Sequence, residues 1–336
     1  MNKQKLVSIA AVCIILAGCS SGANSFFSGN DKNTKKTSGA YEDNSSRISQ
    51  DTPKNDTKGK AVDEKKAQSS PAPTPTPTPT PSHSPQNIPS QPVPKVAAGE
   101  KLKFDVIDKL DNTKYSWWLS LNNQHKTPGF PSQAKKFVEK HDGIYIGDTT
   151  RKIVYLTFDE GYENGYTSKI LDVLKADNVK SIFFVTGPYI KEHPELVKRM
   201  LDEGHLVGNH TINHPSLPTV SDTALENELY GLEKQFSAQY GKGFKYMRPP
   251  MGEYSEKVLV AAQQLGYKTV FWSYAYKDYD VNDQKGADYA YKMVMNNLHN
   301  GAVYLLHAVS KDNAEALDRI IKDLRAEGYT ISPFDL

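Results

Sequence analysis

The sequence predicts an α/β protein in which helices cover a parallel β-sheet. Between residues 151 and 336, short apolar segments rich in β-branched and aromatic residues alternate with helix-like segments. Repeated β-α units of this kind build a parallel sheet, because each helix returns the chain to start the next strand in the same direction. The spacing alone leaves open whether the sheet is doubly wound or closed into a barrel. Polar residues follow several strands, at the end where parallel folds keep their active sites.

The expected elements follow one another in a regular order, and Pro194 stands at a favourable first-turn position of its helix. Strands are expected at residues 153–156, 181–185, 206–208, just before Arg248, and at 268–272, 302–306 and 329–332. Helices are expected at residues 168–176, 194–202, 221–240, 256–265, 287–298 and 314–326. We take residues 151–336 as the catalytic domain.

Residues 1–19 have the features of an export signal. Two lysines precede an apolar core that is too short to cross a membrane as a resident helix. The segment ends in Leu16-Ala17-Gly18-Cys19, which resembles the lipobox of bacterial lipoproteins. The resemblance implies that Cys19 is lipidated and that the protein is extracytoplasmic, anchored to the outer face of the cell membrane. The alternative is an ordinary tail with an incidental cysteine.

Residues 20–100 are predicted to be a disordered linker, because they contain too few aromatic residues to bury a core. Within it, residues 71–81 alternate proline with alanine or threonine, which favours a polyproline II spacer of roughly 35 Å. Residues 101–150 contain enough apolar bulk to form an ordered lead-in that packs on the barrel. In this segment Trp117 and Trp118 can serve either as core residues or as a platform for sugar stacking.

The overall composition excludes several classes of function. The 336-residue chain has a formal net charge of +2, which gives no support for a nucleic-acid partner. Its two cysteines, Cys13 and Cys19, both lie in the predicted signal. The globular part therefore has no disulfide and no thiolate ligand, so any metal must be held by histidine, aspartate or glutamate.

Two adjacent acids, Asp159 and Glu160, follow the apolar strand that begins at residue 153. Burying a carboxylate costs several kcal/mol unless it is paired or binds a metal. The pair therefore predicts a nearby cation or a catalytic role, although capping of the next helix would also explain it.

Two histidines, His210 and His214, follow another predicted strand and are four residues apart. On a helical turn this spacing places both imidazoles on one face, where they can bind one ion. Two histidines and one carboxylate leave coordination positions open for water and substrate, which is typical of a hydrolytic site.

Three further polar residues lie at or after the ends of predicted strands: Arg248, Asp278 and His307. The guanidinium of Arg248 could pair with a carboxylate in two-pronged geometry. Each of these residues also has an ordinary interpretation, as a surface ion pair or a core side chain. Their common position at one edge of the sheet favours a shared site.

These motifs, in this order, resemble the polysaccharide deacetylases of carbohydrate esterase family 4, the NodB homology domain. The resemblance extends from about residue 151 to residue 336. It implies a distorted (β/α) barrel and a metal-dependent hydrolase that removes N-acetyl groups from amino sugars. The expected cofactor is one divalent ion, with zinc as the leading candidate.

The resemblance also implies roles for the residues of the first two motifs. Asp159 matches the general base, which takes a proton from metal-bound water. The metal ligands match Glu160, His210 and His214. Thr211 matches a residue that braces the histidine loop by a hydrogen bond.

The remaining motifs imply the other catalytic groups. Arg248 matches the residue that holds the general base, and the backbone N–H of Met251 matches the donor to the oxyanion. His307 matches the general acid that protonates the leaving amine. Asp278 matches the carboxylate that keeps this histidine protonated.

The sequence departs from the usual family pattern at four positions, namely Glu160 in place of aspartate, Met251 in place of an aromatic residue, Tyr279 in place of tryptophan, and Ala275 in place of aspartate. The added methylene of Glu160 changes the reach of a predicted metal ligand. None of the four changes removes an essential proton donor or acceptor.

Within the family, residues 145–149, 161–167, 284–287 and 310–317 look like the delta-lactam-biosynthetic de-N-acetylases. This resemblance implies action on N-acetylmuramic acid in the peptidoglycan glycan strand, formation of the muramic δ-lactam of spore cortex, and an amidase partner that first removes the stem peptide. One alternative is a deacetylase of N-acetylglucosamine in peptidoglycan or another glycan. Another is an inactive lipoprotein that binds the cell wall.

Overall fold

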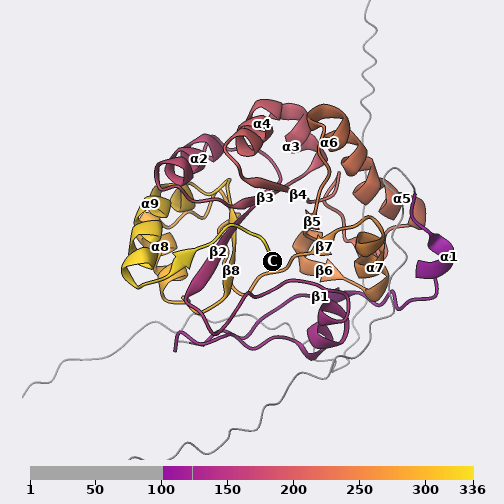
Figure 1. The fold of residues 1–336 in the computed structure, drawn as a ribbon, viewed down its shortest axis with the longest axis horizontal. Helices are drawn as coiled ribbons and strands as arrows, with labels where there is room; N and C mark the ends of the chain where they lie inside the picture. Colours follow the sequence, from indigo (N-terminus) through magenta and orange to yellow (C-terminus); the bar gives the residue numbers. More distant parts are fainter. Residues whose placement is uncertain (1–100, 123) are drawn as a thin grey trace, which may run out of the picture. The chain divides into compact units, whose positions relative to one another are not determined.

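The computed structural model describes residues 101–122 and 124–336 (Figure 1). The predicted signal peptide, linker and Cys19 lipidation site fall outside these residues. No helix in the described part of the chain combines the length and apolar character needed to cross a bilayer.

The core of the described part is a sheet of seven strands whose neighbours all run parallel. Along the sheet the order is β7-β5-β4-β3-β2-β8, and β9 pairs with the start of β2. The strands are β2 (Ile153–Glu160), β3 (Ile182–Val185), β4 (Leu206–Asn209), β5 (Tyr246–Met247), β7 (Lys268–Thr269), β8 (Ala302–His307) and β9 (Thr330–Ile331). The predicted parallel α/β class is therefore confirmed.

The chain that follows β7 brings the two edges of this sheet together. Ser273 donates its backbone N–H to Val303 of β8 at 3.0 Å, and Leu305 donates to Tyr274 at 2.9 Å. Tyr274 also forms a parallel bridge with Tyr304. Because one segment pairs with β5 at its start and with β8 at its end, the sheet curls into a distorted barrel, as the family resemblance implied.

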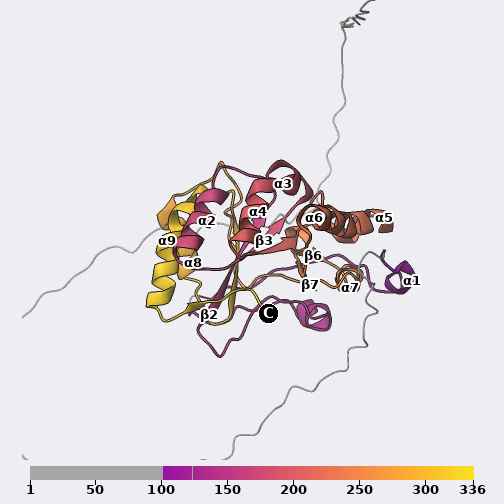
Figure 2. The same cartoon turned by 45° about the horizontal axis from the view of Figure 1, so that its top comes forward.

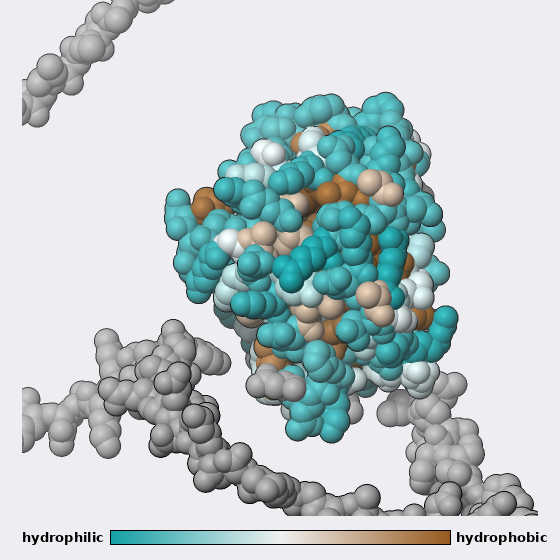
Figure 3. Space-filling model, turned by 90° about the vertical axis from the view of Figure 1, so that its left-hand side faces the viewer, coloured by the Kyte–Doolittle hydropathy of each residue, from teal (hydrophilic) through white to brown (hydrophobic). Residues whose placement is uncertain are grey.

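Helices cover the outside of this barrel (Figures 1 and 2). They are α2 (Thr167–Ala176), α3 (Gly187–Glu192), α4 (Pro194–Asp202), α5 (Asp222–Glu226), α6 (Leu232–Tyr240), α7 (Glu256–Gln264), α8 (Ala287–Met295) and α9 (Lys311–Ala326). The short α3 is absent from the sequence prediction. The expected long helix at residues 221–240 contains a π-helical turn, η3 (Asn227–Gly231), between α5 and α6. The face formed by α2, α8 and α9 is mostly hydrophilic (Figure 3).

The lead-in segment runs along the side of the sheet that lies away from α2, α3 and α4 (Figures 1 and 2). It contains α1 (Phe104–Ile107), β1 (Tyr115–Ser116) and the π-helical turn η1 (Ala134–Glu139), and β1 pairs antiparallel with β6 (Glu253–Tyr254). Trp117 is buried and stacks on Phe271 with ring centroids 4.6 Å apart, whereas Trp118 is exposed. Of the two tryptophans, Trp117 is thus a core residue.

Alternate residues of β2 face different surroundings, as side chains of a strand must. Ile153 and Tyr155 belong to a cluster inside the barrel, which Phe334 joins through edge-on contacts with Tyr155 and Tyr246. Val154, Leu156 and Phe158 instead belong to the large cluster under the helices. Continuing this alternation, Asp159 faces the barrel interior and Glu160 faces the helices.

Candidate active site

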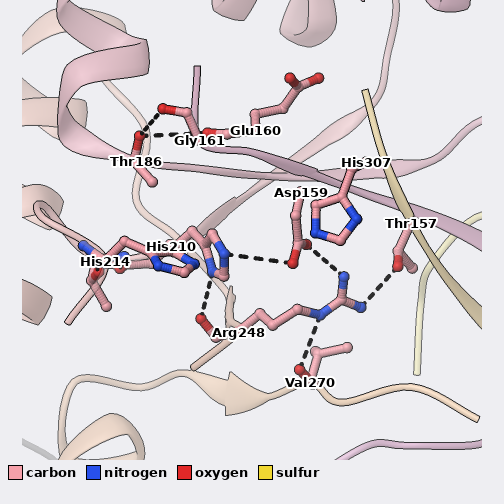
Figure 4. A network of polar contacts seen from close by, with 12 residues as sticks. Thr157, Asp159, Glu160, Gly161, Thr186, His210, His214, Arg248, Val270 and His307 are labelled. Carbon is pink, nitrogen blue, oxygen red and sulfur yellow. Dashed lines mark hydrogen bonds and ion pairs between the residues drawn. The ribbon is translucent and has the colours of Figure 1, made fainter. Parts of the chain in front are cut away.

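Asp159 lies at the carboxyl end of β2, where Arg248 holds it in place (Figure 4). The Arg248 side chain is fully buried, and its Nη1 donates to Asp159 Oδ1 at 2.6 Å. Its other N–H groups donate to Thr157 Oγ1 at 2.8 Å and to the carbonyl oxygens of Val270 and Phe271 at 3.2 Å. A guanidinium with this many partners is rigid, so the carboxylate it contacts is rigid too. The predicted contact between the two residues is present, but through one N–H and not in the expected two-pronged geometry, because the other N–H groups bond to Thr157 and to the backbone.

His210 and His214 also come together, but by a route other than the predicted one. Their ring centroids are 4.8 Å apart, and His210 Nε2 lies 3.5 Å from Asp159 Oδ2. The residues between them form a loop and not a helical turn, with left-handed backbone at Thr211 (φ 68°) and His214 (φ 56°). Thr211 Oγ1 accepts a hydrogen bond from the His214 backbone N–H at 3.0 Å, as the predicted brace requires.

Glu160 does not join the two histidines, which corrects the expected grouping of the three as ligands of one ion. Its fully buried carboxylate points away from them (Figure 4) and lies 3.4 Å from Thr167 Oγ1. The physical reason is the strand alternation that sends Asp159 inward and Glu160 outward. Burial, aided by the nearby charge of Glu163, raises the pKa of Glu160 well above its usual value, which favours the neutral acid.

His307 and Asp278 form a second pair of catalytic candidates beside Asp159. His307 ends β8, where it is the register partner of Asp159, and its Nδ1 lies 2.7 Å from Asp278 Oδ1. Asp278 Oδ2 accepts from the His307 backbone N–H at 2.8 Å and from Asn313 Nδ2 at 2.6 Å. Three hydrogen bonds therefore fix the orientation of the carboxylate toward the imidazole.

These surroundings shift the pKa values of the candidate residues in opposite directions. Burial works against the charged form of Asp159, but the adjacent charges, Arg248 first, outweigh it and lower its pKa. Burial alone would lower the pKa of His307, yet the charge of Asp278 and its hydrogen bond raise it. The site thus favours an ionised aspartate and a protonated histidine, which is the pairing of a general base with a general acid.

A cavity of about 810 Å³ opens above these groups. Its wall includes Asp159, His210, His214 and His307 together with mostly apolar residues. Three large side chains at the cavity stay unusually exposed: Tyr162 at 50%, Met251 at 54% and Tyr279 at 56%. A wall that combines catalytic groups with exposed apolar surface fits a ligand with both polar and apolar faces, such as a sugar.

Met251 lies in the turn η4 (Pro250–Gly252), which follows Arg248 and forms one wall of the cavity. Its backbone is left-handed (φ 57°), as is that of Gly252 (φ 65°). A Cβ at position 252 would come within 2.6 Å of the Trp272 ring, so only glycine fits there. The turn therefore holds the backbone of Met251 in one conformation at the cavity wall.

The donor chemistry of the site fits a divalent metal ion in part. His210 Nδ1 pairs with the Arg248 carbonyl oxygen at 2.8 Å, which leaves Nε2 as the free lone pair. Burial lowers the pKa of His210 to about 4, so its imidazole is neutral, as a metal ligand must be. Asp159 is the carboxylate beside it. Within residues 101–122 and 124–336, however, no three His, Cys, Asp or Glu side chains are grouped as a ready metal site.

Two residues of this site were missed by sequence reasoning. Asn313 orients Asp278, and Glu228 accepts two hydrogen bonds from Asn213, the residue before His214. Both lie on helices, far along the chain from their partners, and neither stands at the end of a strand. No short-range pattern in the sequence identifies them.

Comparisons with known proteins agree with this geometry. A family model described as polysaccharide deacetylase matches residues 146–270. The peptidoglycan-N-acetylmuramic acid deacetylase PdaA of Bacillus subtilis is 46% identical over 229 residues, which span 68% of this chain and 87% of the relative.

The chain belongs to the polysaccharide deacetylase family. This confirms the resemblance and places the chain in a family of enzymes.

Other members of the polysaccharide deacetylase family support the same fold. The solved structure of Bacillus subtilis PdaA, described as a family 4 carbohydrate esterase, has a TM-score of 0.65 at 47% identity and covers 67% of this chain and 96% of its own. A peptidoglycan-N-acetylglucosamine deacetylase of Bacillus cereus is 36% identical over 198 residues, or 57% of this chain and 70% of the relative. Family members thus differ in the amino sugar that their names specify.

Proposed function

We propose that this protein hydrolyses the N-acetyl group of N-acetylmuramic acid residues in peptidoglycan. The observation that carries the proposal is that Asp159 and His307 line one cavity, each held by its own partner. Their surroundings lower the pKa of Asp159 and raise the pKa of His307. The name and 46% identity of the Bacillus subtilis relative support muramic acid as the sugar.

The two residues divide the proton transfers of the reaction. Asp159 takes a proton from the attacking water as the oxygen adds to the acetamide carbon. Arg248 keeps the carboxylate oriented and ionised during this step. His307 then gives its proton to the sugar nitrogen as the carbon–nitrogen bond breaks, which yields acetate and a free amine. Asp278 stabilises His307 in its protonated form before transfer.

Developing negative charge on the carbonyl oxygen needs a donor in the cavity wall. The backbone N–H of Met251 is our candidate, because the turn η4 fixes its position. One such preorganised donor contributes about 3 kcal/mol to lowering a barrier of this kind.

We further propose that His210 and His214, with Asp159 as the nearest carboxylate, bind one divalent ion, with zinc preferred. Neutral imidazoles suit zinc, and an open site leaves room for substrate. Such an ion, when bound, lowers the pKa of water and polarises the acetyl carbonyl. Glu160 is left out of this set, because Asp159 and not Glu160 faces the histidines. Asp159 keeps its role as the general base.

Three parts of the proposal extend beyond the catalytic domain. Lipidation at Cys19 would anchor the protein to the outer face of the cell membrane, with residues 20–100 as a tether to the glycan strand. Prior removal of the stem peptide by an amidase would leave a lactyl carboxylate beside the new amine. Ring closure between these two groups, with loss of one water molecule, would give the muramic δ-lactam of spore cortex.

Mass spectrometry of digested peptidoglycan tests the substrate. Purified glycan strands without stem peptides are incubated with residues 98–336, with and without a chelator, and acetate release is measured. The proposal expects loss of acetyl from muramic acid that a chelator reduces. Loss from glucosamine alone would instead favour the alternative suggested by the Bacillus cereus relative. No release, with Asp159→Asn behaving like the parent, would favour an inactive cell-wall-binding protein.

A further inference from the structure

The π-helical turn η3 (Asn227–Gly231) lies against the loop that carries the two histidines. It interrupts an otherwise continuous helix that runs through α5 and α6, and the backbone at both of its ends stays helical. Such turns are rare and are frequently found at functional sites. Three contacts connect this turn to residues 209–214.

The first and strongest contact is made by Glu228. Its buried carboxylate accepts two hydrogen bonds from one residue of the loop, Asn213. Oε2 accepts from the Asn213 backbone N–H at 2.7 Å, and Oε1 accepts from Asn213 Nδ2 at 2.7 Å. A buried carboxylate is tolerated only when its oxygens are satisfied, so this two-point contact fixes the residue between the histidines.

The other two contacts hold the beginning and the middle of the loop. The carbonyl oxygen of Leu229 accepts from Asn209 Nδ2 at 2.9 Å, and Asn209 Oδ1 in turn accepts from the Thr211 backbone N–H at 2.8 Å. Ile212 approaches Gly231 so closely that a Cβ there would lie 3.0 Å from its Cδ1. One turn of helix therefore contacts the loop near both histidines.

The loop needs support from outside, because its own backbone is unfavourable. Left-handed conformations at Thr211 (φ 68°) and His214 (φ 56°) are disfavoured for residues other than glycine, and most of all for β-branched threonine. Such conformations persist only where surrounding contacts enforce them. The contacts from η3 supply that enforcement.

We propose that Glu228 is a positioning residue for the two histidines of the active site. It does not line the cavity and acts through Asn213, which does. By fixing Asn213 it sets the direction of His214 relative to His210 and Asp159. The kinetic part of its test rests on the proposed deacetylase function, whereas the structural part does not.

Exchanging the donor and acceptor groups of Glu228 and Asn213 tests the contact between these two residues. In Glu228→Gln the new amide group faces an N–H donor, so one of the two hydrogen bonds is lost. In Asn213→Asp two carboxylates face each other. In the double variant, the glutamine oxygen at position 228 can accept from the backbone N–H of residue 213 while the glutamine NH₂ group donates to the new aspartate, so both bonds return.

The expected kinetic result follows from misplacement of the histidines by about an ångström. Each single variant lowers kcat/KM for deacetylation of soluble glycan oligomers about 30- to 100-fold, mainly through kcat. The double variant recovers to within about fivefold of the parent. Melting temperatures are measured alongside, because general destabilisation would lower them in all three variants without recovery of kcat.

A spectroscopic measurement reports on the positions of the His210 and His214 imidazoles directly and does not require the enzyme to turn over substrate. Imidazole ¹⁵N–¹H correlation spectra should show shifted His210 and His214 signals in Glu228→Gln, with parental signals in the double variant. His205, buried between other residues near the start of β4, is the internal control and should not move. Should the parent lack deacetylase activity, the proposed function fails while these spectra still decide the role of Glu228.

Parental kcat/KM and parental imidazole spectra in Glu228→Gln would overturn the proposal. So would a double variant as impaired as the worse single variant. If Glu228→Gln does not fold, Asn213→Ala removes the side-chain bond to Glu228 from the exposed side of the loop and keeps the backbone bond. Unchanged His214 signals in that variant would equally refute a positioning role.

Discussion

Replacing Asp278 by asparagine would remove the charge that keeps His307 protonated while keeping the size of the side chain. In the parent, Asp278 Oδ2 accepts from the His307 backbone N–H and from Asn313 Nδ2, and Oδ1 faces His307 Nδ1. In the variant, the asparagine oxygen would take the place of Oδ2, because only there can it accept from both the His307 backbone N–H and Asn313 Nδ2. Its NH₂ group would then face His307 Nδ1, where it disfavours the imidazolium.

The size of the effect follows from the contact that is lost. A charge-assisted hydrogen bond such as the 2.7 Å contact between His307 and Asp278 contributes about 1.5–3 kcal/mol. This corresponds to a fall of about one to two units in the pKa of His307. In the parent, the pKa of His307 lies above its ordinary value. In the variant the contribution of Asp278 is lost, and burial then lowers the pKa of His307. The protonated acid is then lost at a lower pH.

The assay is the pH dependence of kcat/KM, whose alkaline limb reports the general acid of the free enzyme. For Asp278→Asn we expect this limb to move to lower pH by about one to two units, with activity at pH 8 reduced roughly 10- to 100-fold. Asp280→Asn is the matched control, because this partly exposed acid of the same loop pairs with Lys277. An alkaline limb in the same place as in the parent would refute the assignment of His307 and Asp278 as a pair.

Three further predictions concern separate features of the site and its supporting turn. Glu160→Gln should keep activity within about threefold, because burial raises the pKa of Glu160 and favours its neutral form, whereas Asp159→Asn should lose at least about 100-fold in kcat. Equal losses would show that Glu160 has a direct role. Tyr162→Ala should raise KM about fivefold, because stacking of the Tyr162 ring on the sugar is lost. Trp118→Ala is the control and should leave KM unchanged, because Trp118 is exposed but lies outside the cavity wall. Equal KM values in the parent and in Tyr162→Ala would argue against stacking. Gly252→Ala should lower Tm by roughly 3–10 °C in thermal denaturation. The new Cβ would meet the Trp272 ring, and the backbone at this position has a positive φ. A Tm equal to that of the parent would contradict the described packing.

Much of the barrel could be predicted from the sequence because its signals are local. An apolar β-branched segment such as residues 153–156 reads as a buried strand whatever its neighbours are, and β2 includes it. The position of Asp159, Arg248 and His307 at strand ends also placed them at one edge of the sheet before any contact was known. These inferences depend only on chain direction and strand ends.

The sequence does not reveal which way a side chain points, or which residues from distant parts of the chain contact it. Asp159 and Glu160 are neighbours, yet only the register of β2 decides which faces the barrel interior. The spacing of His210 and His214 fits a helical turn, but the structure reaches the same proximity through left-handed residues that η3 supports. Such support comes from contacts between segments far apart in the chain, which short-range patterns do not contain.

The two faces of β2 have a practical consequence for anyone who modifies this protein. At the mouth of the barrel the inward residues Thr157 and Asp159 belong to the site, whereas the outward residues of β2 pack against the helices. Side chains that take part in the site and side chains that stabilise the fold thus alternate along β2. Substitutions meant to stabilise the fold therefore belong at the outward positions of β2, because changes at Thr157 or Asp159 would alter the site itself.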